Sequence, residues 1–350
     1  MTVRERRRSG ATPCDGSTRG FIMNKAPTPI CLFILLVGPL SIATVRQPLL
    51  AGPGRMERCG PVERTGAVAP DRPCWAIARG PTPVLDTPDF RSVYGGKNGL
   101  SIKLDKADLV REVETVAFPG TVFTVHQELP GWGGATMLRV TTDEYPFPSK
   151  KGYYVDSRFV TLSSTRPGER PRKLPGPLML RYRLRSALNR LYVWGGNWRD
   201  GIPAMLRYYP TATRLDDTAW KMWTLRGVDC SGLLCEATDG WTPRNASALV
   251  KFGRAIPIAG LTPPEIAARL EPFDLIVWHK HVVIVLDRGH VIQSRTDDQV
   301  EGAPGGVRID ELVGYLGRLM KEFTPVDSYD DPAPTRDKFV VRRWYPGPVH

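Results

Sequence analysis

The stretch RGVDCSGLLCEATDG, residues 226–240, brings together three side chains whose types can do chemistry. Cys230 lies between Asp229 and Ser231, directly before an apolar run that ends near Gly240. The run predicts a helix that Asp229 or Ser231 caps at its start and that ends before the glycine. Cys230 then occupies the helix N-terminus, where free backbone N–H groups and the helix dipole favour negative charge.

A cysteine in this position is suited to be a nucleophile. We expect the helix N-terminus to hold the pKa of the Cys230 thiol below its ordinary ~8.5, and the same N–H groups can receive the oxyanion of a tetrahedral intermediate. The alternatives are a buried packing residue, half of a disulfide and a metal ligand. Cys235 lies five residues further along the same helix and would point elsewhere, so we interpret it as a packing residue. Zinc fits poorly, because the two cysteines lack the spacing of a metal knuckle.

A nucleophilic cysteine needs a base, and the chain has five histidines. His281 is the best candidate because it begins HVVIVLD, an apolar run that predicts a buried strand. His279 is the nearest rival, since it has the same parity in an extended segment. A lone histidine with no further partner would by default be a surface residue or a satisfied core residue.

Gln293, in HVIQSR, is the candidate group that orients the histidine. If residues 287–289 form a three-residue turn with a left-handed glycine, Leu286 pairs with His290. That register places Gln293 on the side of the sheet that carries His281. Its amide oxygen could then accept the imidazole N–H and fix the tautomer without adding a charge.

The order of elements around these residues predicts an α+β fold. Residues 178–191 and 263–270 have helical periodicity, and residues 273–278, 281–287 and 290–295 have the pattern of consecutive antiparallel strands. Upstream, apolar or alternating runs at 121–127, 135–142 and 152–162 predict a small all-β barrel.

The composition divides the chain into segments. Hydrophobic content of 41% and charged content of 24% are ordinary for a globular protein. We predict the following segments: 1–43 signal peptide, with Met23 as an alternative start; 44–84 extended lead-in; 85–163 β domain; 164–177 linker; 178–323 catalytic domain; 324–350 C-terminal tail. Cys59 and Cys74, both within the lead-in, could form a local disulfide.

The N-terminal segment predicts export. An uncharged, mostly apolar run from Ile30 to Val45 follows Lys25 and suits a secretory signal better than a membrane span. An uncleaved anchor is the alternative; otherwise we expect no stable span, and a location in the periplasm or cell envelope. The net charge of +12 favours anionic partners in general. The sequence has no run of basic residues with interleaved aromatics, so it does not indicate a nucleic-acid partner.

The motifs YVWGG, VDCSGLL, WTPRNAS, PFDLIVW, HVVIVL and HVIQS occur in the order seen in NlpC-type cell-wall cysteine peptidases, and the chain resembles this family over residues 178–296. The β region resembles the bacterial SH3-like domains that accompany such enzymes. The resemblance implies a papain-like catalytic domain in which a nucleophile helix packs on an antiparallel sheet. It implies no cofactor and no metal.

The resemblance also assigns roles to residues. It makes Cys230 the nucleophile, His281 the base and Gln293 the polar residue twelve positions later. Tyr192 matches a tyrosine credited with oxyanion or substrate contacts. The remaining pair, Asp229 and Ser231, match residues that hold the ammonium group of a free N-terminal L-Ala in some members.

Three departures from the family pattern stand out. Phe273 and Val283 replace glycines, and the segment 197–226 is much longer than usual. We expect this insert to form a loop over the cleft, with Trp220, Trp223, Tyr208 or Arg207 near the substrate.

The predicted function is hydrolysis of the D-Glu–diamino acid amide bond in peptidoglycan stem peptides or muropeptides, through a Cys–His acyl-enzyme. The alternatives are a non-catalytic wall-binding protein, and an amidase or acyltransferase on the same papain-like fold. The sequence does not distinguish which diamino acid is accepted or whether a free L-Ala is required.

Overall fold

The computed structural model describes residues 74–296, 305–332 and 337–346. These residues belong to one of the two units into which the chain divides, Pro53–His350. The predicted signal peptide, most of the lead-in and Cys59 lie outside the described residues. Within the ranges given above, no helix is long and apolar enough to cross a lipid bilayer.

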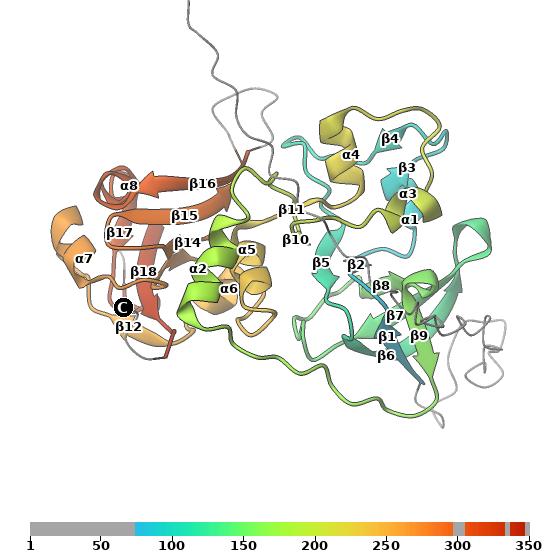
Figure 1. Cartoon of the computed structure of the whole chain (residues 1–350), viewed down its shortest axis with the longest axis horizontal. Coiled ribbons are helices and arrows are strands. Elements are labelled where there is room, and N and C mark those ends of the chain that lie inside the picture. The colour runs from blue at the N-terminus through green and yellow to red at the C-terminus, as the bar shows by residue number, and fades with distance from the viewer. Residues whose placement is uncertain (1–73, 297–304, 333–336, 347–350) are drawn as a thin grey trace, which may run out of the picture. The chain divides into compact units, whose positions relative to one another are not determined.

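The first half of the described chain is built on one antiparallel sheet with the strand order β5-β2-β8-β7-β6-β1-β9 (Figure 1). The strands are β1 Cys74–Ala78, β2 Thr82–Leu85, β5 Val113–Ala117, β6 Val122–Pro130, β7 Thr136–Thr141, β8 Tyr153–Asp156 and β9 Val160–Ser163. Shorter elements are α1 Phe90–Val93, β3 Tyr94–Gly95, β4 Ser101–Ile102 and the 3-10 turns η1 Trp132–Gly134 and η2 Ser157–Phe159. The strands predicted at 121–127, 135–142 and 152–162 are therefore present.

The predicted start of the β domain, at residue 85, is wrong. β1 and β2 precede it, and β1 pairs with both β6 and β9. The sequence of β1, CWAIA, alternates buried and half-buried positions, as a strand with one face on a core does. The Pro- and Arg-rich surroundings concealed this short alternation.

The 197–226 insert belongs to the core of this half, so its prediction as a loop over the cleft is wrong. It contains α3 Ala204–Tyr208 and α4 Asp217–Trp223. Trp223 is fully buried, lies 6.1 Å from the Tyr94 ring centroid and donates its indole N–H to the backbone oxygen of Tyr209. Of the residues expected near substrate, Trp223 supplies core area, Tyr208 and Trp220 are half-buried, and Arg207 is exposed.

The second half contains a mixed α+β arrangement around an antiparallel sheet with the order β12-β18-β13-β14-β15-β16, with β17 parallel to β18. Its strands are β12 Arg254–Ile256, β13 Leu275–Trp278, β14 His281–Val285, β15 His290–Arg295, β16 Gly306–Glu311, β17 Phe323–Pro325 and β18 Asp337–Arg343. A short pair, β10 Asn197–Trp198 with β11 Gly227–Val228, leads into the helix that carries the cysteine. The predicted strands 273–278, 281–287 and 290–295 are confirmed.

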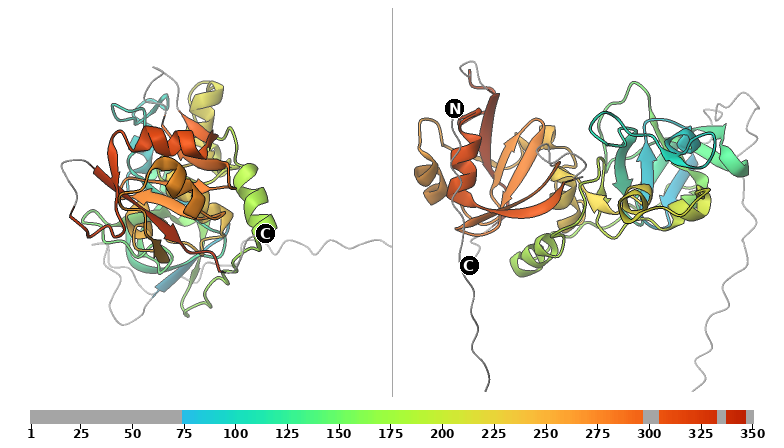
Figure 2. Two further views of the ribbon diagram at one scale, coloured as in Figure 1. Left: turned by 90° about the vertical axis from the view of Figure 1, so that its left-hand side faces the viewer. Right: turned by 90° about the horizontal axis from the view of Figure 1, so that it is seen from above.

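Helices cover both faces of this sheet (Figures 1 and 2). One face packs against α2 Pro177–Arg185, α5 Cys230–Ala237 and α6 Ala246–Leu249, and the other against α7 Pro263–Arg269 and α8 Leu312–Leu319. The alternation of β14 divides its side chains between the faces: Val282 and Ile284 join the core on the α5 side, and Val283 and Val285 join the other. α5 is thereby fixed against the centre of the sheet.

The predicted C-terminal tail is also wrong in part, because β18 lies inside the sheet between β12 and β13. Phe339, Val340 and Val341 are fully buried. This apolar run is only three residues long and charged residues flank it, so its hydrophobicity is weak in the sequence. Pairing on both edges compensates for its short length.

Phe273 stands where the family pattern has glycine, and its backbone is left-handed, with φ of 73°. A side chain at such φ is strained. Its ring is fully buried and packs 5.1 Å from the Tyr345 ring, while its carbonyl accepts the Trp344 indole N–H at 2.7 Å. Packing by the C-terminal segment therefore offsets the strain that glycine would avoid.

We predict that Phe339→Ala lowers the free energy of unfolding by about 3–5 kcal/mol, because it removes a fully buried ring of β18. Urea unfolding followed by circular dichroism measures it. The control is Val313→Ala, which truncates an α8 residue that is 37% exposed. Equal stability of the two variants would contradict the placement of β18 in the sheet.

Candidate active site

α5 begins at Cys230 because Asp229 caps it. Asp229 has an extended backbone, and its Oδ1 accepts the Gly232 N–H at 2.6 Å. This is the N-cap predicted from the sequence, with the acid rather than Ser231 in the capping position. The cap fixes the sulfur-bearing residue as the first of the helix.

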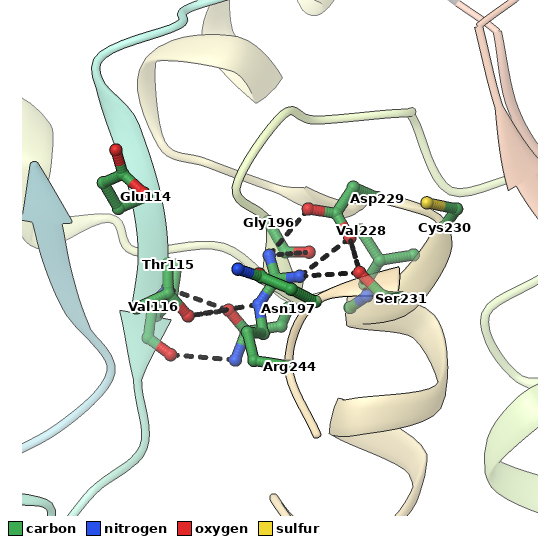
Figure 3. Close-up of polar contacts among 12 residues, drawn as sticks. Glu114, Thr115, Val116, Gly196, Asn197, Val228, Asp229, Cys230, Ser231 and Arg244 are labelled. Carbon is green, nitrogen blue, oxygen red and sulfur yellow. Dashed lines mark hydrogen bonds and ion pairs between the residues drawn. The ribbon is translucent and has the colours of Figure 1, made fainter. Parts of the chain in front are cut away.

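The Asp229 carboxylate also forms a buried ion pair with Arg244 (Figure 3). Arg244 Nη2 lies 2.6 Å from Oδ2 and Nη1 lies 2.9 Å from Oδ1, and both residues are buried. The Ser231 hydroxyl donates to Oδ1 at 3.2 Å and accepts from Arg244 Nη1 at 3.1 Å. Asp229 and Ser231, both predicted to hold a substrate ammonium group, are thus already joined to one guanidinium.

Arg244 connects α5 to the first half of the described chain. Its Nε donates to Thr115 Oγ1 at 3.1 Å, and the Thr115 hydroxyl donates to Asn197 Oδ1 at 3.0 Å. Asn197 in turn exchanges two hydrogen bonds with the Val116 backbone, each 2.8 Å long (Figure 3). Arg244 lies in the motif WTPRNAS, whose residue types alone indicate no role for it.

The Cys230 sulfur lies against the start of β14. Its thiol is 4.0 Å from the Lys280 carbonyl oxygen, and the Val282 N–H donates to the sulfur. The pairing of β14 with β15 begins only at Ile284, so the ladder does not use this N–H. The sulfur therefore contacts the backbone on both sides of His281.

His281 is oriented by Gln293, as predicted. His281 Nε2 and Gln293 Oε1 are 2.9 Å apart, and the imidazole lies 5.1 Å from the Trp278 ring. His279, the rival base, instead lies in the turn after β13 and stacks on Tyr329 at 4.2 Å. The Cys230 sulfur contacts backbone beside His281, and the His281 ring contacts Gln293. His279 takes part in neither contact.

The turn that sets this register has the predicted length. Leu286 N–H donates to the His290 carbonyl at 2.9 Å. The left-handed conformation expected of Gly289 is wrong, since its φ is not positive. Asp287 closes the turn instead, because its Oδ1 accepts the Gly289 N–H at 3.0 Å and contacts His290 Nδ1 at 2.8 Å.

Burial keeps both Cys230 and His281 neutral near pH 7, so the expected lowering of the thiol pKa is wrong. Burial, and then the nearby Asp229 carboxylate, raise the pKa of the Cys230 thiol to about 12, against the opposing effect of N–H donors from Val282 and Ser231. Burial lowers the pKa of His281 to about 4, although the Gln293 oxygen favours the protonated ring. In this buried site the desolvation of a charge outweighs the helix N-terminus.

Tyr192, the predicted oxyanion or substrate contact, is 9% exposed. Burial raises the pKa of its hydroxyl, and the negative charges of Asp229 and of a Cys230 thiolate raise that pKa further. The hydroxyl thus stays protonated and able to donate near the sulfur.

Two further cysteines and the possibility of a metal site complete the predicted chemistry. Cys235 is a free, buried cysteine on α5, and Cys74 is disulfide-bonded; Cys59, its predicted partner, lies outside the described residues. No group of three or more His, Cys, Asp or Glu in the described part of the chain is arranged to hold a metal ion.

Comparisons with known proteins find similar solved structures only. No protein-family model matches the chain, and no curated protein does. An NlpC/P60 family protein from Bacillus cereus is 16% identical, with a TM-score of 0.29, over 79% of this chain and 64% of that one, less than two thirds of its length. NlpC1 from Trichomonas vaginalis is 11% identical, with a TM-score of 0.27, over 81% and 98% of the two chains. NlpC2 from the same organism is 14% identical, with a TM-score of 0.25, over 77% and 72%.

We predict that Arg244→Met lowers the free energy of unfolding by about 3–5 kcal/mol, because it leaves the buried Asp229 carboxylate without its cation. Adding Asp229→Asn should restore part of this loss. Lys251→Met, which breaks an exposed ion pair with Asp330, is the matched control and should cost at most about 1 kcal/mol. Denaturant unfolding measures all three; a cost for Arg244→Met no larger than for Lys251→Met would contradict the account.

We also predict that iodoacetamide alkylates Cys230 slowly at pH 7 and faster as the pH rises above 9. The reason is that the raised thiol pKa leaves little thiolate at neutral pH. Peptide mass spectrometry in a Cys235→Ala background measures the rate, with glutathione as the reference thiol. Fast alkylation that is independent of pH from 5 to 9 would indicate a resting thiolate–imidazolium pair and contradict the neutral one.

Proposed function

We propose that the chain is an exported cysteine peptidase of the NlpC type that hydrolyses the D-Glu–diamino acid amide bond of peptidoglycan stem peptides. The observation that carries this proposal is the position of Cys230. Its sulfur lies at a helix start, against the backbone on both sides of His281, and Gln293 orients that histidine. A wall-binding protein without catalysis has no need of this arrangement.

The proposed reaction has two steps. As the Cys230 sulfur attacks the scissile carbonyl carbon, the thiol proton passes to His281 and the carbonyl electrons move to oxygen. The C–N bond then breaks, His281 returns the proton to the leaving amine, and a thioester remains on the cysteine. Water, deprotonated by His281, attacks the thioester carbonyl; the C–S bond breaks, the acyl group leaves as a carboxylic acid, and His281 returns the proton to the Cys230 sulfur.

A neutral resting pair is compatible with this chemistry. The base takes the proton only as the sulfur attacks, so two separated charges need not exist in the empty buried site. The Tyr192 hydroxyl and the free N–H groups at the start of α5 are the proposed donors to the oxyanion. Asp229 and Ser231 stay proposed substrate contacts, with the carboxylate's charge shared with Arg244.

The charge of the chain agrees with the proposed substrate. The predicted signal peptide 1–43 holds six Lys/Arg and two Asp/Glu, a charge of +4, so +8 of the net charge of +12 remains after its removal. Stem peptides carry carboxylates, and this positive charge favours their approach. Export to the periplasm or cell envelope, and the SH3-like identity of the first half, belong to the same proposal. An amidase or acyltransferase would use the same nucleophile, so products must distinguish them.

We predict that the chain cuts defined muropeptides after D-Glu and that Cys230→Ala reduces kcat/KM by at least about 10⁴-fold, since it removes the nucleophile. Cys235→Ala is the matched control, because it removes a second buried thiol from the same helix and should retain activity. Mass spectrometry identifies the products. Equal products from wild type and Cys230→Ala, or no cleavage by either, would contradict the peptidase; transfer to an added amine in place of hydrolysis would identify an acyltransferase.

A further inference from the structure

Asp310 lies next to the residue that orients the histidine. It is on β16, where Arg308 pairs with Gln293 and Asp310 pairs with Val291. Asp310 therefore stands two residues from the partner of Gln293, on the same face of the sheet. Gln293 Nε2 donates to Asp310 Oδ2 at 2.8 Å, so the chain of contacts continues beyond the amide.

The chemistry of this contact fixes which way the Gln293 amide points. An ionised carboxylate can only accept hydrogen bonds, so it must face the NH₂ group of the amide. The amide oxygen is then turned to His281 Nε2, at 2.9 Å. A flipped amide would place its oxygen against a carboxylate oxygen and lose one charge-assisted hydrogen bond.

The orientation of the amide fixes the histidine tautomer in turn. A carbonyl oxygen accepts, so His281 Nε2 must carry the hydrogen, and Nδ1 is left with a free lone pair. Only that lone pair can take the thiol proton. With the amide flipped, the NH₂ group would donate to Nε2, and the hydrogen would move to Nδ1.

Two arginines balance the charge of Asp310. Arg318 Nη2 lies 3.3 Å from Oδ1, and Arg308 Nε lies 3.6 Å from Oδ2. Because Gln293 separates the carboxylate from the ring, the negative charge acts on the tautomer without directly contacting the imidazole. Burial keeps this base neutral in the resting site.

We propose that Asp310 is a positioning residue that selects the Nε2–H tautomer of His281 by locking the orientation of the Gln293 amide. This role rests on the proposed function only for its effect on catalysis. The tautomer itself is a property of the folded chain, with or without a substrate.

The test is nitrogen-15 NMR of the histidine rings in the full chain, with His281 assigned by its loss in His281→Ala. Wild type should show the Nε2–H pattern alone at pH 7. Asp310→Asn keeps the shape of the side chain but can either donate or accept, so the Nδ1–H pattern should appear. The matched control is Asp337→Asn, which changes an exposed carboxylate at the first residue of β18. It should leave the pattern unchanged.

Cleavage of muropeptides gives the second readout. In Asp310→Asn, kcat should fall at least about twofold, in proportion to the remaining Nε2–H fraction, with KM unchanged. An unaltered tautomer and kcat in Asp310→Asn would overturn the proposal. So would the Nδ1–H pattern in wild type, a result that does not depend on how well the variant folds. A tautomer that responds in a chain that cuts no muropeptide would support the lock and contradict the peptidase.

Discussion

The buried ion pair of Asp229 with Arg244 determines where α5 begins, and the site is built from that point. The carboxylate caps the helix at Gly232 while the guanidinium takes both of its oxygens. Because removal of either partner would leave an uncompensated charge in the interior, other backbone arrangements around Cys230 are costly. The same guanidinium contacts Thr115, so the pair also ties α5 to the first half of the described chain.

A second chain of contacts, from Asp310 through Gln293, positions the proposed base His281. Cys230 and His281 are both buried, and burial keeps both uncharged. The carboxylates in these two chains of contacts, Asp229 and Asp310, each pair with an arginine. Charge is thus kept one residue away from the reacting atoms, where it can orient them without stabilising a resting ion pair.

Local patterns in the sequence predict much of the site. The DCSG sequence indicates the cap, and the parity of His281 and Gln293 across a three-residue turn indicates their contact. What the sequence conceals depends on distant partners. Arg244 and Asp310 look like ordinary surface charges until the sheet and α5 bring them to Asp229 and Gln293.

The predictions that were wrong also depend on tertiary contacts that the sequence does not reveal. β18 is a short apolar run among charged residues, and only pairing with β12 and β13 identifies it as a central strand. The aromatic insert resembles a substrate loop until Trp223 is found against Tyr94. The thiol pKa follows from burial, which a helix N-terminus in a sequence does not reveal.

The most direct test of the account is a search for the thioester. A muropeptide is mixed with excess full chain, the reaction is quenched in acid within milliseconds, and the protein is digested for mass spectrometry. We predict that the peptide containing Cys230 carries the mass of the D-Glu-terminated acyl fragment, and that this adduct decays as free product appears. Product formation at the same rate with no adduct on Cys230 would contradict the assignment of this cysteine as the nucleophile.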